Sequence, residues 1–397
     1  MASIKSLLRI SFFIFVIVML IPIQAKAILP KAEILLQKMI QADNSLDFEG
    51  RLTIMLQSQM GNQAFEVYVT RKAPDKRRIE IISPDELYGT GFIINGNENI
   101  PIRQGNTPRF FPPPPFLQPD QMEDAQIHNT QILLKNYKAR VLDGGSVAGR
   151  NTYLIEIEPK NSGRPSSKIW IDKEKSITLK TEQYNAKKML QRVIAYSTID
   201  FEPVIDDTSF QIPRKFWDKK RPFRQSDREE IWNYTQEKPD LDKLKDKVHF
   251  EIILPDRVSG GFALQSINII KIGKEQNIHL KYTDGLTTLS VFQSPSNEMG
   301  KRPRNEPPGG PPPPSSQPPP PPPKDRVEKI IINGVNCEVL SRTPVLIFRW
   351  QNKGIYYTII GELQKKEMTS IASLFISKET HVKSITPRIN AGACVET

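Results

Sequence analysis

Residues that commonly carry catalysis or bind metals are few and widely spaced in this chain of 397 residues. No nucleophile elbow, phosphate-binding loop, dinucleotide-binding glycine motif or zinc-protease helix motif occurs. The paired carboxylates Asp206-Asp207 and Glu229-Glu230 stand in loop-like sequence, where solvation is the usual role of acidic residues. The four histidines and two cysteines lack the spacing of metal ligands: His128, His249, His279, His381, Cys337 and Cys394. We therefore expect neither an enzyme nor a bound cofactor or metal.

The N-terminal residues 1–27 predict a secretory signal peptide. Lys5 and Arg9 precede a mostly apolar stretch at residues 10–23, and Ala25-Lys26-Ala27 supplies the small residues that signal peptidase requires. The apolar stretch is shorter than the ~20 residues of a membrane-spanning helix. We therefore predict cleavage after Ala27 and a mature protein that works outside the cytoplasm.

The charge of the chain indicates local contacts rather than a polyanionic partner. The net charge is +11, and cleavage would lower it to +8 because it removes Lys5, Arg9 and Lys26. Outside the cytoplasm we expect no nucleic-acid partner; lipid headgroups, lipopolysaccharide phosphates or acidic protein surfaces are the expected counterparts of basic patches. In an oxidising compartment Cys337 and Cys394 are a candidate disulfide, with two unrelated thiols as the alternative.

Hydrophobic periodicity predicts a first domain at residues 28–213. Apolar residues recur at helical spacing over residues 32–40, whereas residues 52–69 alternate as two strands around a turn at Gly61-Asn62. Further strand-like runs follow at residues 78–82, 90–94, 138–142 (before a turn at Asp143-Gly144-Gly145), 152–157, 168–172, 179–184 and 189–197. Strands joined in sequence by tight turns predict an antiparallel, strongly curved sheet.

One face of the first hairpin is the candidate lipid cavity. Its alternating apolar residues are Leu52, Ile54, Leu56, Phe65, Val67 and Val69. A proline-rich segment at residues 108–119 carries the candidate cover, Phe110, Phe111 and Phe116, for which packing on the outside of the sheet is the alternative. The same apolar faces would also suit a solid core, and a register error of one residue would move the whole set to the opposite face.

A charged linker is predicted at residues 214–247, a second domain at 248–380 and a tail at 381–397. Residues 214–224 carry a local charge of +5, which suits contact with a phosphate-bearing lipid or a solvated linker. Strand-like runs flank Asp284-Gly285, which we interpret as a structural turn rather than a contact site. The 13 prolines of residues 303–323 predict an exposed polyproline insertion, and residues 368–375 predict a closing helix.

Several segments together resemble the RseB/MucB family, the periplasmic regulators of an envelope-stress sigma factor pathway. Their order and spacing carry the resemblance more than any one of them does. The segments are residues 45–50, 77–78, 169–174, 178–180 and 190–196 in the first domain, and residues 254–255, 261–262, 282–286, 290–291 and 358–363 in the second.

The resemblance implies an α+β protein with two parts. The first is an unclosed, curved antiparallel β-barrel with covering helices, similar to the lipoprotein carrier LolA, and the second is a smaller α/β domain that here holds the proline-rich insertion. Members bind the periplasmic segment of a membrane anti-sigma factor and shield it from proteolysis, and lipopolysaccharide or lipoprotein acyl chains relieve that protection. They have no enzymatic activity. A LolA-like carrier or scaffold for lipoproteins or lipids is the alternative function.

Overall fold

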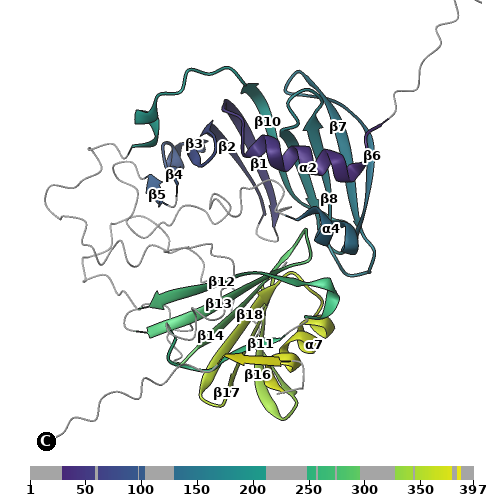
Figure 1. Cartoon of the computed structure of the whole chain (residues 1–397), viewed down its shortest axis with the longest axis vertical. Coiled ribbons are helices and arrows are strands. Elements are labelled where there is room, and N and C mark those ends of the chain that lie inside the picture. Colours follow the sequence, from purple (N-terminus) through teal and green to yellow (C-terminus); the bar gives the residue numbers. More distant parts are fainter. Residues whose placement is uncertain are drawn as a thin grey trace, which may run out of the picture.

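Two antiparallel β-sheets with a few helices organise the chain (Figure 1). The structure is a computed structural model, and it describes residues 29–58, 61–96, 98–102, 129–211, 248–255, 258–272, 275–295, 327–342, 345–377 and 382–385. Several predicted features lie outside these residues: the signal peptide, Phe110, Phe111, Phe116, the charged linker, the polyproline insertion and Cys394.

The first sheet has ten strands and does not close. They are β1 (Phe48–Ser58), β2 (Gly61–Lys72), β3 (Lys76–Ser83), β4 (Gly91–Asn95), β5 (Glu98–Ile102), β6 (Tyr137–Val147), β7 (Arg150–Pro159), β8 (Ser166–Asp172), β9 (Thr178–Tyr184) and β10 (Leu190–Asp200). Their order is β5-β4-β3-β2-β1-β10-β9-β8-β7-β6, so among the strands that the structure describes β5 and β6 are the edges of this sheet. The predicted α+β fold with a curved, unclosed antiparallel sheet is confirmed.

Helix α2 (Ala32–Asp43) lies over the part of the first sheet that contains β6, β7 and β8 (Figure 1). Its helical spacing places Leu35, Leu36 and Met39 on one buried face, as the sequence predicts. These side chains pack against isoleucines of β7 and β8. The helix therefore covers one end of the curved sheet.

A second, short helix, α4 (Thr130–Asn136), lies beside α2. It begins at Asn129, whose side-chain oxygen accepts hydrogen bonds from the backbone amides of Gln131 and Ile132. Leu133 is fully buried in the cluster that α2 covers. The sequence did not predict α4, because seven residues are too few for a clear helical period. The described chain also has three 3₁₀ turns: η1 (Asp85–Leu87), η3 (Asp207–Phe210) and η5 (Ser259–Gly261).

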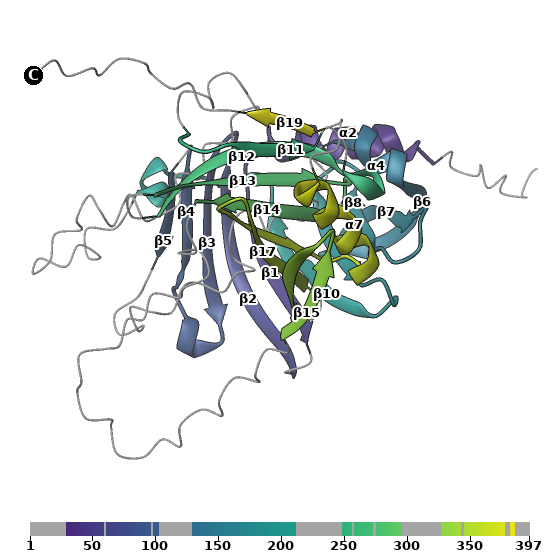
Figure 2. The ribbon, with the colours of Figure 1, turned by 90° about the horizontal axis from the view of Figure 1, so that it is seen from below.

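The second domain is built on a seven-stranded antiparallel sheet. Its strands are β12 (Ala263–Ile272), β13 (Glu275–Thr283), β14 (Thr288–Ser294), β15 (Val327–Ile332), β16 (Val335–Arg342), β17 (Val345–Asn352) and β18 (Ile355–Gly361), in the order β12-β13-β14-β18-β17-β16-β15. The predicted closing helix is confirmed as α7 (Lys365–Ile376), which packs Met368, Ile371 and Phe375 on the sheet. From below, the strands of the two sheets run in crossed directions (Figure 2).

The first hairpin and β6 turn at different residues from those predicted. Ser58 pairs with Gly61, so the first turn precedes Gly61 and Asn62 is already in β2. Strand β6 continues through Asp143-Gly144-Gly145 with a bulge in its pairing to β7. The chain turns instead at Ala148 and Gly149, which both have the positive φ that a tight hairpin requires.

The second domain extends beyond its predicted boundary at residue 380. Strand β19 (Val382–Ile385) pairs with β11 (Ile252–Pro255) in a separate two-stranded sheet. Residues 382–385, which were predicted as tail, therefore belong to the second domain. Within the described residues, no helix is long and apolar enough to span a bilayer.

The register of β1 is testable with a pair of neighbouring substitutions. Ile54 is fully buried, whereas the next residue, Met55, is 45% exposed on the opposite face. We expect Ile54→Ala to lower the free energy of unfolding by about 3 kcal/mol, because it deletes buried methyl groups and leaves a cavity. Met55→Ala should change it little. Chemical denaturation measures both, and equal losses would contradict the assignment of faces.

Candidate functional site

The six residues of the candidate lipid cavity lie together on one face of the β1–β2 hairpin. Leu52 pairs with Val67 and Ile54 with Phe65, and Ile54 and Val67 are fully buried. Leu56 is half-buried at the border of the same cluster, which also includes side chains of β3, β9 and β10. That an acyl chain binds against this face stays a prediction.

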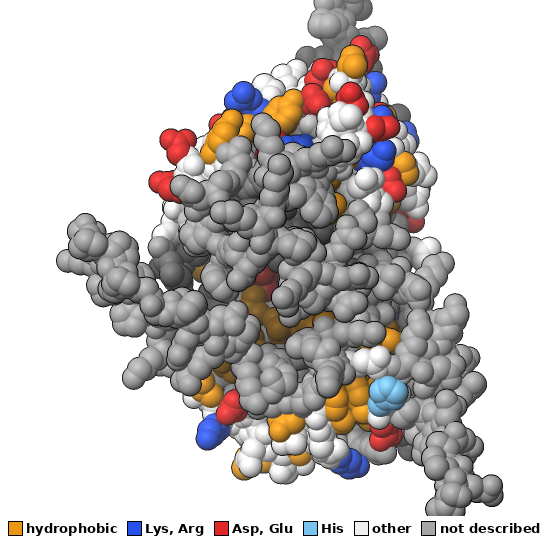
Figure 3. Space-filling view, turned by 90° about the vertical axis from the view of Figure 1, so that its left-hand side faces the viewer, with side chains coloured by type: hydrophobic (Ala, Val, Ile, Leu, Met, Phe, Trp, Pro, Cys, Tyr) orange, Lys and Arg blue, Asp and Glu red, His pale blue; other side chains and the backbone are white. Residues whose placement is uncertain are grey.

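A pocket of about 360 Å³ lies elsewhere, at the boundary between the domains. Its lining comes from both of them: Ile132, Lys135, Val258, Gly261, Phe262 and Ala263. The volume is at the lower end of the range for small-molecule sites. Hydrophobic side chains are also visible between the two domains from the left-hand side of Figure 1 (Figure 3).

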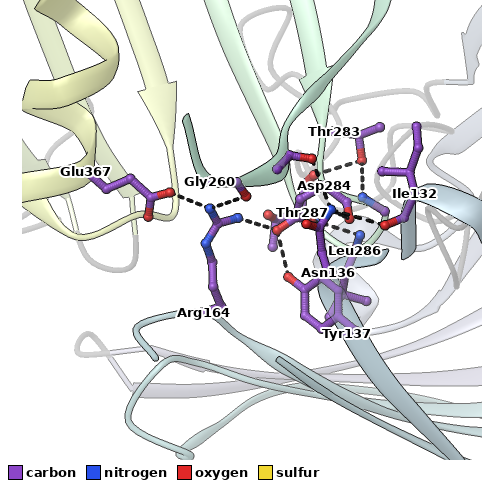
Figure 4. Close-up of polar contacts among 12 residues, drawn as sticks. Ile132, Asn136, Tyr137, Arg164, Gly260, Thr283, Asp284, Leu286, Thr287 and Glu367 are labelled. Atoms are coloured by element: carbon purple, nitrogen blue, oxygen red, sulfur yellow. Dashed lines mark hydrogen bonds and ion pairs between the residues drawn. The ribbon is translucent and has the colours of Figure 1, made fainter. Parts of the chain in front are cut away.

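The two domains are held together by a buried ion pair. Arg164, in the loop between β7 and β8, contacts the Asp284 carboxylate through Nη1, and their side chains are 6% and 1% exposed. Nη2 of Arg164 also donates to the Gly260 carbonyl at 2.8 Å and contacts the Glu367 carboxylate of α7. Its guanidinium lies 4.6 Å from the centre of the Phe262 ring. One first-domain side chain thus contacts three elements of the second domain (Figure 4).

The end of α4 makes the second set of contacts across the boundary. The Tyr137 hydroxyl donates to Asp284 Oδ2 at 2.8 Å. The Asn136 side-chain amide donates to the Gly261 and Asp284 carbonyls at 3.0 Å and 2.9 Å. Burial, and then the Asp284 carboxylate, raise the pKa of the Tyr137 phenol well above its ordinary value, so it remains a hydrogen-bond donor. We call Asn136, Tyr137, Arg164, Asp284 and Glu367 the interdomain joint.

The β13–β14 turn is shaped to fit against α4. Asp284 Oδ1 accepts hydrogen bonds from the Leu286 and Thr287 amides at 3.0 Å and 2.7 Å, which leaves Oδ2 for the joint. Gly285 has φ of +100°, and a Cβ at this position would overlap the backbone of Leu133. The predicted turn at Asp284-Gly285 is confirmed, and the structure adds that this turn lies against α4 of the first domain.

The sequence does not predict the other members of the joint. Arg164 lies in a loop with no periodicity, and Glu367 is one of many charged residues near the start of a helix. The Asp-Gly dipeptide marks the turn but carries no information about burial. These residues are distant in the sequence and become neighbours only in the folded chain.

The fold and the joint define a two-domain α+β protein in which a large open sheet is fastened to a smaller sheet domain. Within the first domain, residues 92–213 match the family model described as the MucB/RseB N-terminal domain. This match confirms the resemblance to the RseB/MucB family. A comparison with curated protein sequences gives no match.

Solved structures align with this chain at low sequence identity. The complex structure of Pseudomonas aeruginosa MucA/MucB aligns with 86% of this chain and 96% of that chain, at 14% identity and a TM-score of 0.50. MucB in complex with MucA(peri) covers 89% and 98%, at 13% identity and 0.49. A LolA superfamily protein from Nitrosomonas europaea covers 46% and 99%, at 14% identity and 0.22. At these identities the first alignment indicates a shared fold, and the two lower scores support no conclusion.

Cys337 lies in the buried core of the second domain. Cys337 is 1% exposed, its thiol donates to the Val335 carbonyl at 3.6 Å, and burial raises the pKa of the thiol. Its pairing with Cys394 stays a prediction. Among the described residues, no group of three or more His, Cys, Asp or Glu side chains could hold a metal ion.

His279 is a buried base in the second sheet. Its Nε2 lies 2.9 Å from the Ser290 hydroxyl, and its ring stacks on Phe292 at 4.4 Å between centres. Burial, and then the charge of Lys281, lower the pKa of His279 from 6.5 to about 4. The unfolded chain therefore binds more protons than the folded chain between these two values.

The stability of the protein should consequently fall in acid. Because the folded pKa is lowered, the contribution of His279 is complete above pH 6.5 and is lost as the pH falls toward 4, by roughly 3 kcal/mol in the free energy of unfolding. His279→Gln should remove most of this slope in denaturation measured across the range. Exposed His249 offers the matched control, His249→Gln. Identical slopes in both variants would contradict the assignment to His279.

Proposed function

We propose that this protein is a periplasmic, non-enzymatic regulator that binds the periplasmic segment of a membrane anti-sigma factor and shields it from proteolysis. Lipid-type ligands, such as lipopolysaccharide or lipoprotein acyl chains, bind at the apolar face of the first domain and relieve that protection. The observation that carries the proposal is a first domain that matches the MucB/RseB N-terminal domain model over residues 92–213 and is joined through a buried ion pair to a second domain.

The partner is proposed from the family and its fold. MucB of the Pseudomonas aeruginosa MucA/MucB complex has a fold like that of this chain, with 96% of its length aligned. The resemblance to RseB/MucB supports an anti-sigma factor as the corresponding partner here. The uneven charge of the chain, with a net value of +11, suits an acidic segment or an anionic lipid as a counterpart.

The second domain favours a regulator over a LolA-like carrier. A carrier of acyl chains needs a single apolar concavity, and here that would be the first domain. The second domain has its own large buried core and contributes Asp284 and Glu367 to the joint. Its fixed attachment supports a role in which both domains act on one partner.

The lipid-sensing part of the proposal requires a defined thermodynamic relation. If lipid weakens anti-sigma binding by some factor, anti-sigma binding must weaken lipid binding by the same factor. The apolar face of the first hairpin is the proposed lipid site because its residues form one continuous cluster with β3, β9 and β10. Leu56 lies at the border of this cluster and is half-buried, so a charge there is tolerable to the fold.

A binding experiment with the purified chain tests both parts. The periplasmic segment of a single-span membrane protein encoded beside the gene should be retained by the immobilised chain and released when lipopolysaccharide is added. Leu56→Asp should retain the segment but resist release by at least tenfold in lipopolysaccharide concentration, whereas Met55→Asp on the exposed face should behave as the wild type.

Two results would count against the proposal in different ways. Failure to retain any such segment would exclude the regulator. Retention without release would exclude lipid sensing alone. Transfer of a lipoprotein between membranes, in the absence of segment binding, would favour the carrier.

A further inference from the structure

Helix α4 contributes side chains both to the apolar interior of the first domain and to the interdomain joint. Leu133 is fully buried in the cluster that contains Leu36 of α2. Asn136, the last residue of this helix, and Tyr137, which follows it and begins β6, donate hydrogen bonds to the second domain. Seven residues therefore connect the packing under α2 with the contacts of the β13–β14 turn.

The contact between α4 and the β13–β14 turn is so close that side-chain movement alone cannot accommodate a shift of α4. Gly285 approaches the backbone of Leu133 so nearly that a Cβ would overlap it, and a Cβ at Gly261 would overlap the Asn136 side chain. Leu286, in the same turn, packs against the first-domain cluster that contains Leu133. Because backbone touches backbone, a shift of α4 must displace the turn or break the contact.

The polar contacts make a partly separated position of the two domains unfavourable. Asp284 is 1% exposed and is satisfied by Arg164, Tyr137 and the amides of its own turn. A partial separation would leave buried charges without partners, which costs more than either the closed joint or a fully hydrated open one. The joint is therefore expected to be closed or open, with little between.

We propose that α4 is the mechanical link between the two domains, through which a change in the apolar interior of the first domain opens the joint and releases the second domain. This inference deepens the regulation described under the proposed function and rests on it for the ligand that displaces α4. The link itself is a property of the chain alone. It assigns Leu133, Tyr137 and the 284–287 turn as its positioning residues.

Two substitutions in the full two-domain chain test the link without any ligand. Leu36→Ala removes a side chain from the cluster that contains Leu133 of α4, whereas Ile93→Ala removes a side chain of the same size from a separate cluster at β4 and β5. Backbone hydrogen exchange is measured at Leu286 and Thr287, whose amides Asp284 holds in the second domain. We expect at least tenfold faster exchange at these amides in Leu36→Ala and no change in Ile93→Ala.

A tyrosine pair provides a second test that leaves the core packing intact. Tyr137→Phe removes the hydroxyl that donates to Asp284, and Tyr184→Phe removes a hydroxyl that donates to Glu182 within the first domain. Faster exchange at Leu286 and Thr287 is expected in the first variant alone. Circular dichroism establishes that each variant is folded; if Leu36→Ala unfolds, the tyrosine pair decides.

The proposal is overturned if the two members of a folded pair give the same exchange at these amides, whether raised or unchanged. Neither pair involves a lipid or an anti-sigma segment. A failure here is therefore distinct from a failure of the proposed function, which the binding experiment measures.

Discussion

The arrangement of the two domains depends on one buried ion pair, between Arg164 and Asp284. Neither charge can be buried alone, because an unpaired charge in the interior costs several kcal/mol. Each is therefore surrounded by groups that satisfy it: Glu367 and the Gly260 carbonyl for the guanidinium, and the Tyr137 hydroxyl and two turn amides for the carboxylate. This directional set permits one relative position of the domains, whereas apolar contact alone would permit many.

The same turn joins the polar and the apolar sides of the interface. Asp284 provides the charge, Gly285 permits the close approach to α4, and Leu286 packs against the interior that α2 and α4 cover. A shift of the first-domain helix α4 would therefore disturb contacts that three consecutive residues of the second domain make. In a regulator whose ligand binds in the first domain, these contacts are a physical route by which ligand binding affects the second domain.

Most of the fold could be predicted from the sequence, and the joint could not, for one physical reason. Strand alternation and helical spacing are local, so the sequence predicts β8, β9, α2 and α7 close to their observed bounds. Even the Asp-Gly turn was located. Arg164 and Asp284 are 120 residues apart, and Tyr137 and Asp284 are 147 apart, so no local pattern relates them. The bulge in β6 and strand β19 were missed because they depend on partners elsewhere in the chain.

We propose that changes in the first domain's apolar interior reach the second domain through α4. The most direct test of this proposal is hydrogen exchange of the wild-type chain with and without a synthetic diacylated lipopeptide. We expect slower exchange in β1 and β2, where the ligand is proposed to bind, together with faster exchange at the Leu286 and Thr287 amides of the second domain. Slower exchange in β1 and β2 with no change at these two amides would contradict it.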